Sequence, residues 1–171
     1  MRRSLRPTAA VLAMALAACD NTTTGPHVNA SWTGSDTVRF TARAKVFWCP
    51  VARRLEVLAI RDDDLGFGLV LFPAGELEPG EFPAVDPGAD TVTRPGVAAA
   101  ARKFTETSIL ALQSDSGRLV LTRQGESFGA QFGFRLKSPD EANTVVVTGE
   151  ATGLVPGPCI ADSVPAAAPM Q

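Results

Sequence analysis

The sequence contains no tyrosine and only one histidine, and aromatic residues make up 6% of its 171 positions. Catalytic Ser–His and Cys–His groups need a histidine as base, and His27 stands alone in a polar stretch near the N-terminus. Gly125–Gly129 matches the G-x-S-x-G elbow of α/β-hydrolases, but no histidine follows Ser127, so we interpret the segment as a hairpin turn. We therefore expect no catalytic residues and no enzyme, with a hydrolase that uses carboxylates as the alternative.

Positive charge is also scarce. Sixteen Lys and Arg residues stand against 18 Asp and Glu residues, which gives a net charge of -2 and no basic patch of the kind that binds phosphate backbones. Nucleic acid is therefore not an expected partner. The run Asp62–Asp64 could indicate calcium, but the apolar residues 67–72 follow at once, where a calcium loop needs alternating oxygen ligands and a later Glu. We interpret the run as a hairpin turn and expect no metal and no cofactor.

The N-terminal segment has the composition of an export signal. Arg2, Arg3 and Arg6 precede the short apolar segment Thr8–Ala15, which is too brief to cross a bilayer as a helix. The stretch Leu16-Ala17-Ala18-Cys19 follows directly, and after it comes a polar run up to Pro26. One alternative is an ordinary secretory signal that is cleaved at a small-x-small site and leaves a soluble product.

The stretch Leu16-Ala17-Ala18-Cys19 resembles the lipobox of bacterial lipoprotein precursors. That resemblance implies that residues 1–18 are a signal peptide and that Cys19 becomes the first mature residue, carrying lipid that includes palmitate. The membrane would then be a partner through the lipid on Cys19, and the protein would lie in the bacterial cell envelope, facing the periplasm or the exterior. Loss of the three arginines of the signal would change the net charge from -2 to -5.

The remaining cysteines are predicted to form a disulfide. With Cys19 assigned to lipid, Cys49 and Cys159 are an even pair in an exported protein, where the environment is oxidising. A metal or redox pair is the alternative, but neither cysteine lies in a C-x-x-C motif and no histidine is near either of them. We expect the bridge to join the end of the best strand in the sequence to a point just beyond the last strand.

The apolar pattern predicts an all-β fold. In Thr37–Cys49, apolar residues alternate with arginine, threonine and lysine over the whole segment, which is typical of an antiparallel sheet with one wet face. We expect an antiparallel β-sandwich of about seven to nine strands. Further strands are predicted at 55–60, 67–72, 80–85, 97–104, 108–113, 118–123, 128–136 and 144–152, with a turn at 114–117.

The predicted domain organisation is a signal peptide at 1–18, a flexible tether at 19–34, the β-sandwich domain at 35–160 and a disordered tail at 161–171. His27 would then be a solvated side chain of the tether. Residues 114–152, with glycine turns and alternating phenylalanines, resemble the small β-sandwich domains of uncharacterised bacterial lipoproteins; the resemblance implies an architecture and brings no ligand residues. The loop at 73–96, rich in proline and glycine, is the expected variable or binding surface.

These observations favour a non-enzymatic structural or interaction module whose protein or glycan partner the sequence does not identify. A β-sandwich that binds carbohydrate or a small ligand through an exposed Trp32 and the loops is the alternative of another class. Burial of Trp32 and Trp48 would argue against that alternative.

Overall fold

The computed structural model describes residues 25–34, 37–61, 64–86, 88, 92–104 and 107–159. Within these ranges the chain forms ten β-strands and no helix. The strands are β1 (His27–Thr33), β2 (Thr37–Cys49), β3 (Arg54–Ile60), β4 (Leu65–Phe72), β5 (Gly80–Pro83), β6 (Gly96–Phe104), β7 (Ile109–Gln124), β8 (Ser127–Lys137), β9 (Thr144–Leu154) and β10 (Gly157–Pro158).

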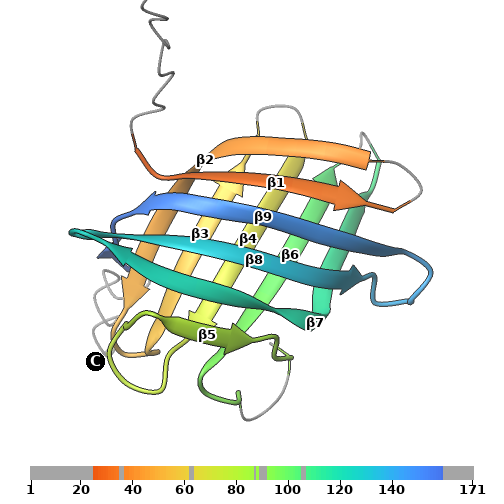
Figure 1. Ribbon diagram of the computed structural model, residues 1–171. Coiled ribbons are helices and arrows are strands. Elements are labelled where there is room, and N and C mark those ends of the chain that lie inside the picture. The colour runs from red at the N-terminus through yellow and green to blue at the C-terminus, as the bar shows by residue number, and fades with distance from the viewer. Residues whose placement is uncertain are drawn as a thin grey trace, which may run out of the picture.

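Eight of the strands close into an antiparallel barrel. The order around the barrel is β1, β2, β3, β4, β6, β7, β8 and β9, and each strand pairs with the next. β9 pairs with β1 and completes the circle. Figure 1 shows β1, β9, β8 and β7 crossing in front of β3, β4 and β6 at a steep angle, so the barrel is flattened into two layers. Because the sheet closes, each of these eight strands pairs with a strand on both sides over part of its length, and none is a terminal edge strand that could serve as a template for aggregation.

Closure corrects two expectations from the sequence. The all-β antiparallel prediction is confirmed, but the sheet is a closed barrel where an open sandwich was expected. Residues 27–33, which were assigned to the tether, are the strand that closes it. Alternation with a period of two predicts one buried face and contains no information on whether two edges meet. The segment looked like a linker because its outward positions are polar, although Val28, Ala30 and Trp32 are all buried.

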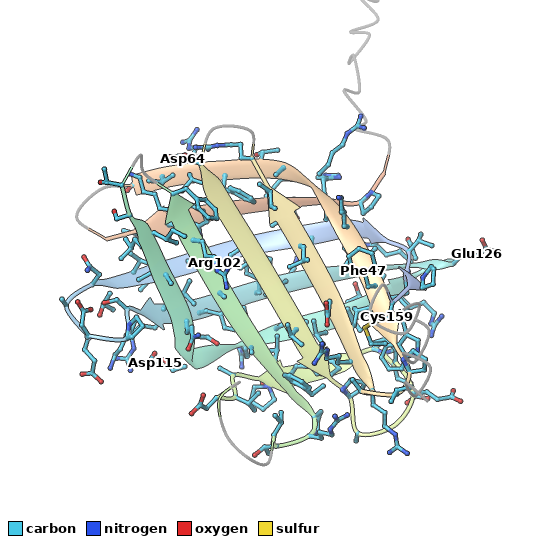
Figure 2. The ribbon with its side chains drawn as sticks, turned by 180° about the vertical axis from the view of Figure 1, so that it is seen from behind. Phe47, Asp64, Arg102, Asp115, Glu126 and Cys159 are labelled. Carbon is cyan, nitrogen blue, oxygen red and sulfur yellow. A yellow bond between two sulfur atoms is a disulfide. The ribbon has the colours of Figure 1, made fainter. Side chains whose placement is uncertain are left out.

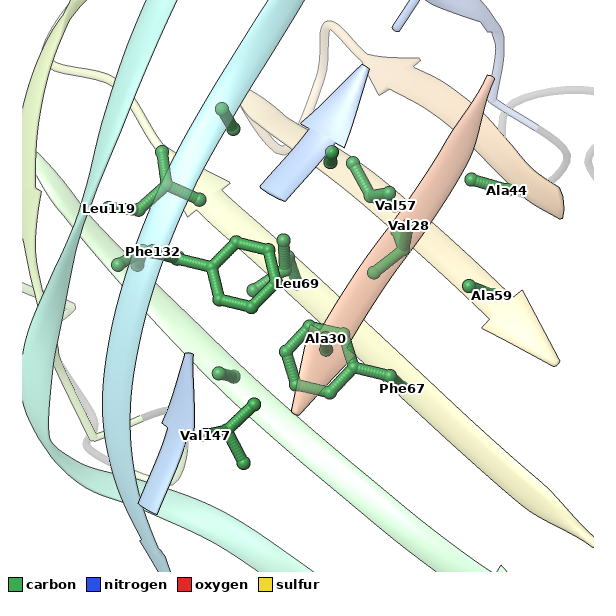
Figure 3. Close-up of a cluster of buried hydrophobic side chains, with 14 of the residues drawn as sticks. Val28, Ala30, Ala44, Val57, Ala59, Phe67, Leu69, Leu119, Phe132 and Val147 are labelled. Atoms are coloured by element: carbon green, nitrogen blue, oxygen red, sulfur yellow. The ribbon is translucent and has the colours of Figure 1, made fainter. Parts of the chain in front are cut away.

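The inside of the barrel is packed with side chains. Inward positions alternate along every long strand, and their apolar residues form one continuous core. A chain of aromatic rings links the two layers, with centroid separations of 5.3 Å from Trp32 to Phe40, 5.2 Å from Phe67 to Phe132 and 5.9 Å from Phe132 to Phe134. Figure 3 shows the rings of Phe67 and Phe132 together within this core. The interior is therefore a solid core through most of its length.

β7 runs without interruption through the turn that was predicted at 114–117. The register shifts between Ser114, which pairs with Leu136, and Ser116, which pairs with Arg135, so Asp115 is the extra residue of a β-bulge. Ahead of the bulge β7 pairs with β6, and beyond it β7 pairs with β5. The buried Ser114 hydroxyl accepts a hydrogen bond of 2.9 Å from the backbone N–H of Ala99 at the place where the two strands part. Short polar residues and glycine are common in β-bulges as well as in turns, which is why the sequence predicted a turn at 114–117.

The bulged Asp115 is held by two cations of β8. Arg135 donates hydrogen bonds of 2.9 and 2.8 Å to its two carboxylate oxygens, and the Lys137 ammonium lies 3.1 Å from one of them. These hydrogen bonds, that from Arg135 above all, hold the pKa of Asp115 well below its ordinary value. The group is on the surface, so salt screens the interaction and its contribution to stability is small. Its main effect is to fix the direction of the bulge.

Gly117, two residues after the bulged Asp115, allows the close approach of β7 and β8. Its φ is +124°, and a Cβ placed there would lie 2.2 Å from the Gly133 carbonyl oxygen and 2.7 Å from the Phe134 Cα. Both contacts are with backbone, so neither neighbour can rotate away. Only glycine fits this position.

We predict that Gly117→Ala lowers the free energy of unfolding by roughly 2–4 kcal/mol, because the methyl group forces the two strands apart. Gly80→Ala is the matched control, since Gly80 also lies in a strand but a Cβ added to it would have no neighbouring atom within 4 Å. That control should change stability by no more than about 0.5 kcal/mol. Urea titration followed by circular dichroism measures both. Equal midpoints for the two variants would contradict the close approach of β7 and β8.

Candidate functional site

The predicted disulfide is present. Cys49 and Cys159 are bonded, with their Cα atoms 4.8 Å apart, and both residues are buried. The bridge joins the last residue of β2 to the residue after β10, and β10 itself pairs in parallel with β2 at Phe47 and Trp48. It therefore holds the C-terminal end of the domain against the barrel, at the end where β1 begins.

Two sequence-predicted features bear on attachment to a membrane. Cys19 and the signal segment 1–18 lie outside the described residues, as does the tail 161–171. Among the residues that the structure describes, no helix is long and apolar enough to cross a membrane.

His27 does not lie free in a tether. It is the first residue of β1, and its ring nitrogens lie 3.1 and 3.3 Å from the Thr152 hydroxyl of β9. Its Nδ1 is also 3.1 Å from the carbonyl oxygen of Gly25. The assignment of this residue to the tether was therefore wrong, since the partly exposed side chain helps to join the first and last long strands of the barrel.

Ser127 lies where a hairpin was expected. It is the first residue of β8, and its hydroxyl donates a hydrogen bond of 3.0 Å to the Gln124 carbonyl across the β7–β8 turn. No group of three or more His, Cys, Asp or Glu side chains among the described residues could hold a metal ion. Of the run that could have indicated calcium, Asp64 is described, while residues 62–63 lie outside the described ranges.

Both tryptophans are less exposed than a surface sugar platform requires. Trp32 is 7% exposed, and Trp48 is partly buried against the core. The proposal that an exposed Trp32 stacks on carbohydrate was therefore wrong about exposure. The burial follows from the alternation along β1, in which Trp32 occupies an inward position and pairs with Val38 of β2 and Val147 of β9.

Trp32 forms part of a hollow at one end of the barrel, which we call the barrel mouth. This is the end at which β1, β3, β6 and β8 finish and β2, β4, β7 and β9 begin. The hollow has a volume of about 410 Å³, within the range of about 300–1,000 Å³ typical of small-molecule sites. Asp64 is one of the residues that line the mouth. In Figure 2 it lies on the opposite side of the molecule from Cys159. The apolar side chains that line the mouth are Trp32, Val38, Leu65, Ala101, Leu110, Leu112 and Val145.

The indole of Trp32 carries the one buried side-chain polar atom without a partner among the described residues. Its Nε1–H has no hydrogen-bond acceptor, while its rings pack 5.3 Å from Phe40 and 6.4 Å from Phe67. An unpaired buried donor costs about 1–3 kcal/mol relative to a hydrogen-bonded one. Native proteins contain few such groups, and each calls for an explanation such as a bound ligand or water.

Lys103 places a positive charge on the rim of the mouth. Val97, Ala99 and Ala101 of β6 are buried and face inward, and Lys103 is the next residue in this alternation. Its cross-strand partner on β4 is Leu65, another inward residue. No ion pair involves Lys103 within the described part of the chain.

Further charged groups surround the same rim. Arg102 follows on β6, and Arg61 and Asp64 lie in the β3–β4 connection. Arg61 is engaged, since it donates a hydrogen bond of 2.7 Å to the Arg39 carbonyl. Among the described residues, three of the four charged side chains that line the mouth, counting Lys103, are cationic. The connections at this end also contain Asp36, Asp62, Asp63 and Glu106, which lie outside the described residues.

Two other hollows lack such features. One, of about 710 Å³, lies on the outer face of β1, β2, β7, β8 and β9, where Arg39 and Arg118 flank Glu150 and short polar side chains. The other, of about 820 Å³, lies beside the disulfide between Trp48, Leu77 and the segment that contains β10. Among the described residues that line them, neither hollow contains a buried polar side chain without a partner. Of these three hollows, the mouth is the one lined by the residue with an unpartnered buried donor.

No known protein family matches this chain, and neither does any curated protein or solved structure. Its function is therefore argued from the geometry of the barrel and from the N-terminal sequence. The mouth could not be found from sequence reasoning, because its residues come from six strands and from a segment that had been assigned to the tether.

Loss of the disulfide is predicted to lower the free energy of unfolding. A bridge that spans 110 residues removes about 4–5 kcal/mol of unfolded-state entropy on the chain-entropy model. The double variant Cys49→Ser, Cys159→Ser should therefore unfold at a lower urea concentration and a lower temperature than the parent chain, with Cys19→Ser as the matched control. An unchanged midpoint in the double variant would show that the bridge does not constrain the barrel.

Proposed function

We propose that the protein is a non-enzymatic lipoprotein of the bacterial cell envelope, whose barrel is held beside a membrane by lipid on Cys19. The main support is the stretch Leu16-Ala17-Ala18-Cys19, which resembles a lipobox. The position of β1 limits the length of the tether. The strand begins at His27, so residues 20–26 are the whole connection between the lipidated cysteine and the barrel. Seven residues span at most about 25 Å when fully extended. The tether is therefore short, and the barrel stays close to the membrane surface.

From the path of β1 we infer which end of the barrel faces the membrane. His27 pairs with Arg43 of β2 and Thr152 of β9, so the chain enters at the end where those strands finish. The disulfide lies at this end. The barrel mouth lies at the opposite end, beyond Thr33, and faces away from the membrane into the periplasm or the exterior.

The anchored barrel acts as an interaction or binding module in this proposal. A hydrolase has less support, since Ser127 of the G-x-S-x-G motif is engaged within a hairpin turn. A carbohydrate-binding module has less support because Trp32 is buried. Binding of a small ligand is the alternative that the hollow at the barrel mouth leaves open.

Metabolic labelling tests the anchor. In a bacterial host the protein should incorporate radioactive palmitate and partition into detergent, and Cys19→Ser should abolish both, because the thiol is the attachment point. The double variant Cys49→Ser, Cys159→Ser is the control for loss of a cysteine and should keep the label if it reaches the envelope. Continued labelling of Cys19→Ser would contradict the lipid anchor and favour ordinary secretion.

A further inference from the structure

We propose that the protein pairs with a second copy of itself through the outer face of β3, β4, β6 and the first part of β7. We call this surface the apolar face. It belongs to the folded barrel, so the proposal goes beyond the anchor and does not depend on lipid at Cys19. The residues that define the apolar face are Leu58, Ile60, Gly66, Gly68, Phe104 and Ile109.

The strands under the apolar face are apolar on both of their sides. Inward residues such as Val57 of β3 and Phe67 of β4 are buried in the core, as alternation requires. The outward residues of β3 nearest the mouth are apolar too, and Leu58 is 43% exposed and Ile60 69% exposed. Apolar residues on both sides of a strand are typical of a sheet that is covered on both faces. The core covers the inner face, so the sequence of this layer indicates a second cover on the outer face.

The opposite layer of the barrel has an ordinary polar outer face. Asn29, Gln131 and Thr148 occupy outward positions there, on β1, β8 and β9. An apolar outer face is therefore a property of one layer and not of the whole barrel. Contiguous exposed apolar surface of this kind marks an interaction site.

Cross-strand pairing makes the apolar face continuous and low. Leu58 pairs with Gly68, and Ile60 pairs with Gly66. Because the glycines have no side chain, larger neighbours lie across β4. A Cβ added to Gly68 would be 3.3 Å from the Leu58 Cδ2, and one added to Gly66 would be 3.9 Å from the Phe104 Cε2. A low, continuous surface suits the packing of one sheet face on another.

The size of the apolar face fits a weak dimer. It extends from Leu58 and Ile60 on β3 to Ile109 on β7, which pairs with Phe104 of β6. With strands about 4.8 Å apart and outward residues about 6.7 Å apart along each strand, the face covers roughly 400–500 Å² per copy. Two copies would bury about 800–1,000 Å² together, which is the size class of weak, reversible complexes.

Arg102 is the charged member of the row that it forms with Ile60, Gly66 and Ala111 across the apolar face. Figure 2 views this side of the molecule and labels Arg102. Its long aliphatic stem can pack between two sheets while the guanidinium stays in water at the margin of the contact. The charge is therefore compatible with a protein contact, whereas deep insertion of this face into a bilayer would desolvate it.

A second copy also fits the anchored molecule. In the proposed orientation the disulfide end lies toward the membrane, so the apolar face is a side wall of the barrel. A two-fold axis parallel to the barrel axis brings two such walls together and leaves both anchored ends on the same side. Attachment to one membrane raises the effective concentration of the two copies, which favours a weak contact. This step rests on the proposed anchor, whereas the contact itself does not.

Sedimentation of the full-length chain with Cys19→Ser tests the contact, because this chain carries no acyl group and needs no detergent. It should show a reversible equilibrium of monomer and dimer, with a dissociation constant of roughly 1–100 μM. In the same background, Ile60→Glu and Ile109→Glu place a charge on opposite sides of the apolar face. Each should weaken dimerisation about tenfold or more, since the buried carboxylate loses water without gaining a partner.

Val146→Glu is the matched control. Val146 is an exposed β-branched residue at an outward position of β9, 49% exposed and outside the apolar face. Its replacement should leave the dimer unchanged, and equal circular dichroism spectra of the three variants would show that each barrel is folded.

Three outcomes would each overturn the proposal. A monomer at every concentration up to about 1 mM would remove the dimer. Equal weakening by Val146→Glu and Ile60→Glu would show that the apolar face is not the contact. Binding of a monomer to phosphatidylglycerol vesicles that Ile60→Glu abolishes would assign the face to a membrane. Because the chain with Cys19→Ser is used, failure of the dimer is distinguishable from failure of the lipid anchor.

Discussion

The pairing of β1 with both β2 and β9 is the constraint on which the rest of the structure depends. Each residue from His27 to Thr33 has a partner on both sides, so the backbone of this short strand completes the circle. Without it, β2 and β9 would expose the hydrogen-bonding groups of seven residues each, a template for aggregation. The mouth would also lose the Trp32 side chain, which belongs to β1. Closure of the sheet, complete burial of the core and formation of the mouth therefore all depend on β1.

The same strand gives the molecule two different ends. At one end the chain enters from the N-terminal segment, the disulfide holds the C-terminal residues, and Val51 and Val155 are exposed. At the other end apolar side chains line the hollow of the barrel mouth. In the proposed orientation the mouth remains open when the opposite end lies on lipid. The Cys49–Cys159 bridge holds the C-terminal residues against the end of β2.

Much of the secondary structure could be predicted from the sequence, because alternation over Thr37–Cys49 or 128–136 reports directly which face is buried. The disulfide could be predicted from the number and compartment of the cysteines. Closure could not, since the seven residues of β1 have polar outward positions that resemble a tether. The bulge at Asp115 could not either, because the residues that favour a turn also favour a bulge. Prediction of the mouth required closure together with the register that places Lys103 beside Leu65.

Amide hydrogen exchange of β1 tests the central claim, closure of the barrel by this strand, most directly. Because both neighbours pair with residues 27–33, the account predicts that the amides of this segment exchange as slowly as those of β8, which lies between two strands in the middle of the sheet. Exchange of residues 27–33 near the rate of an unstructured peptide, with β8 still protected, would contradict closure. It would return the segment to the tether and leave an open sheet with β2 and β9 as its edges.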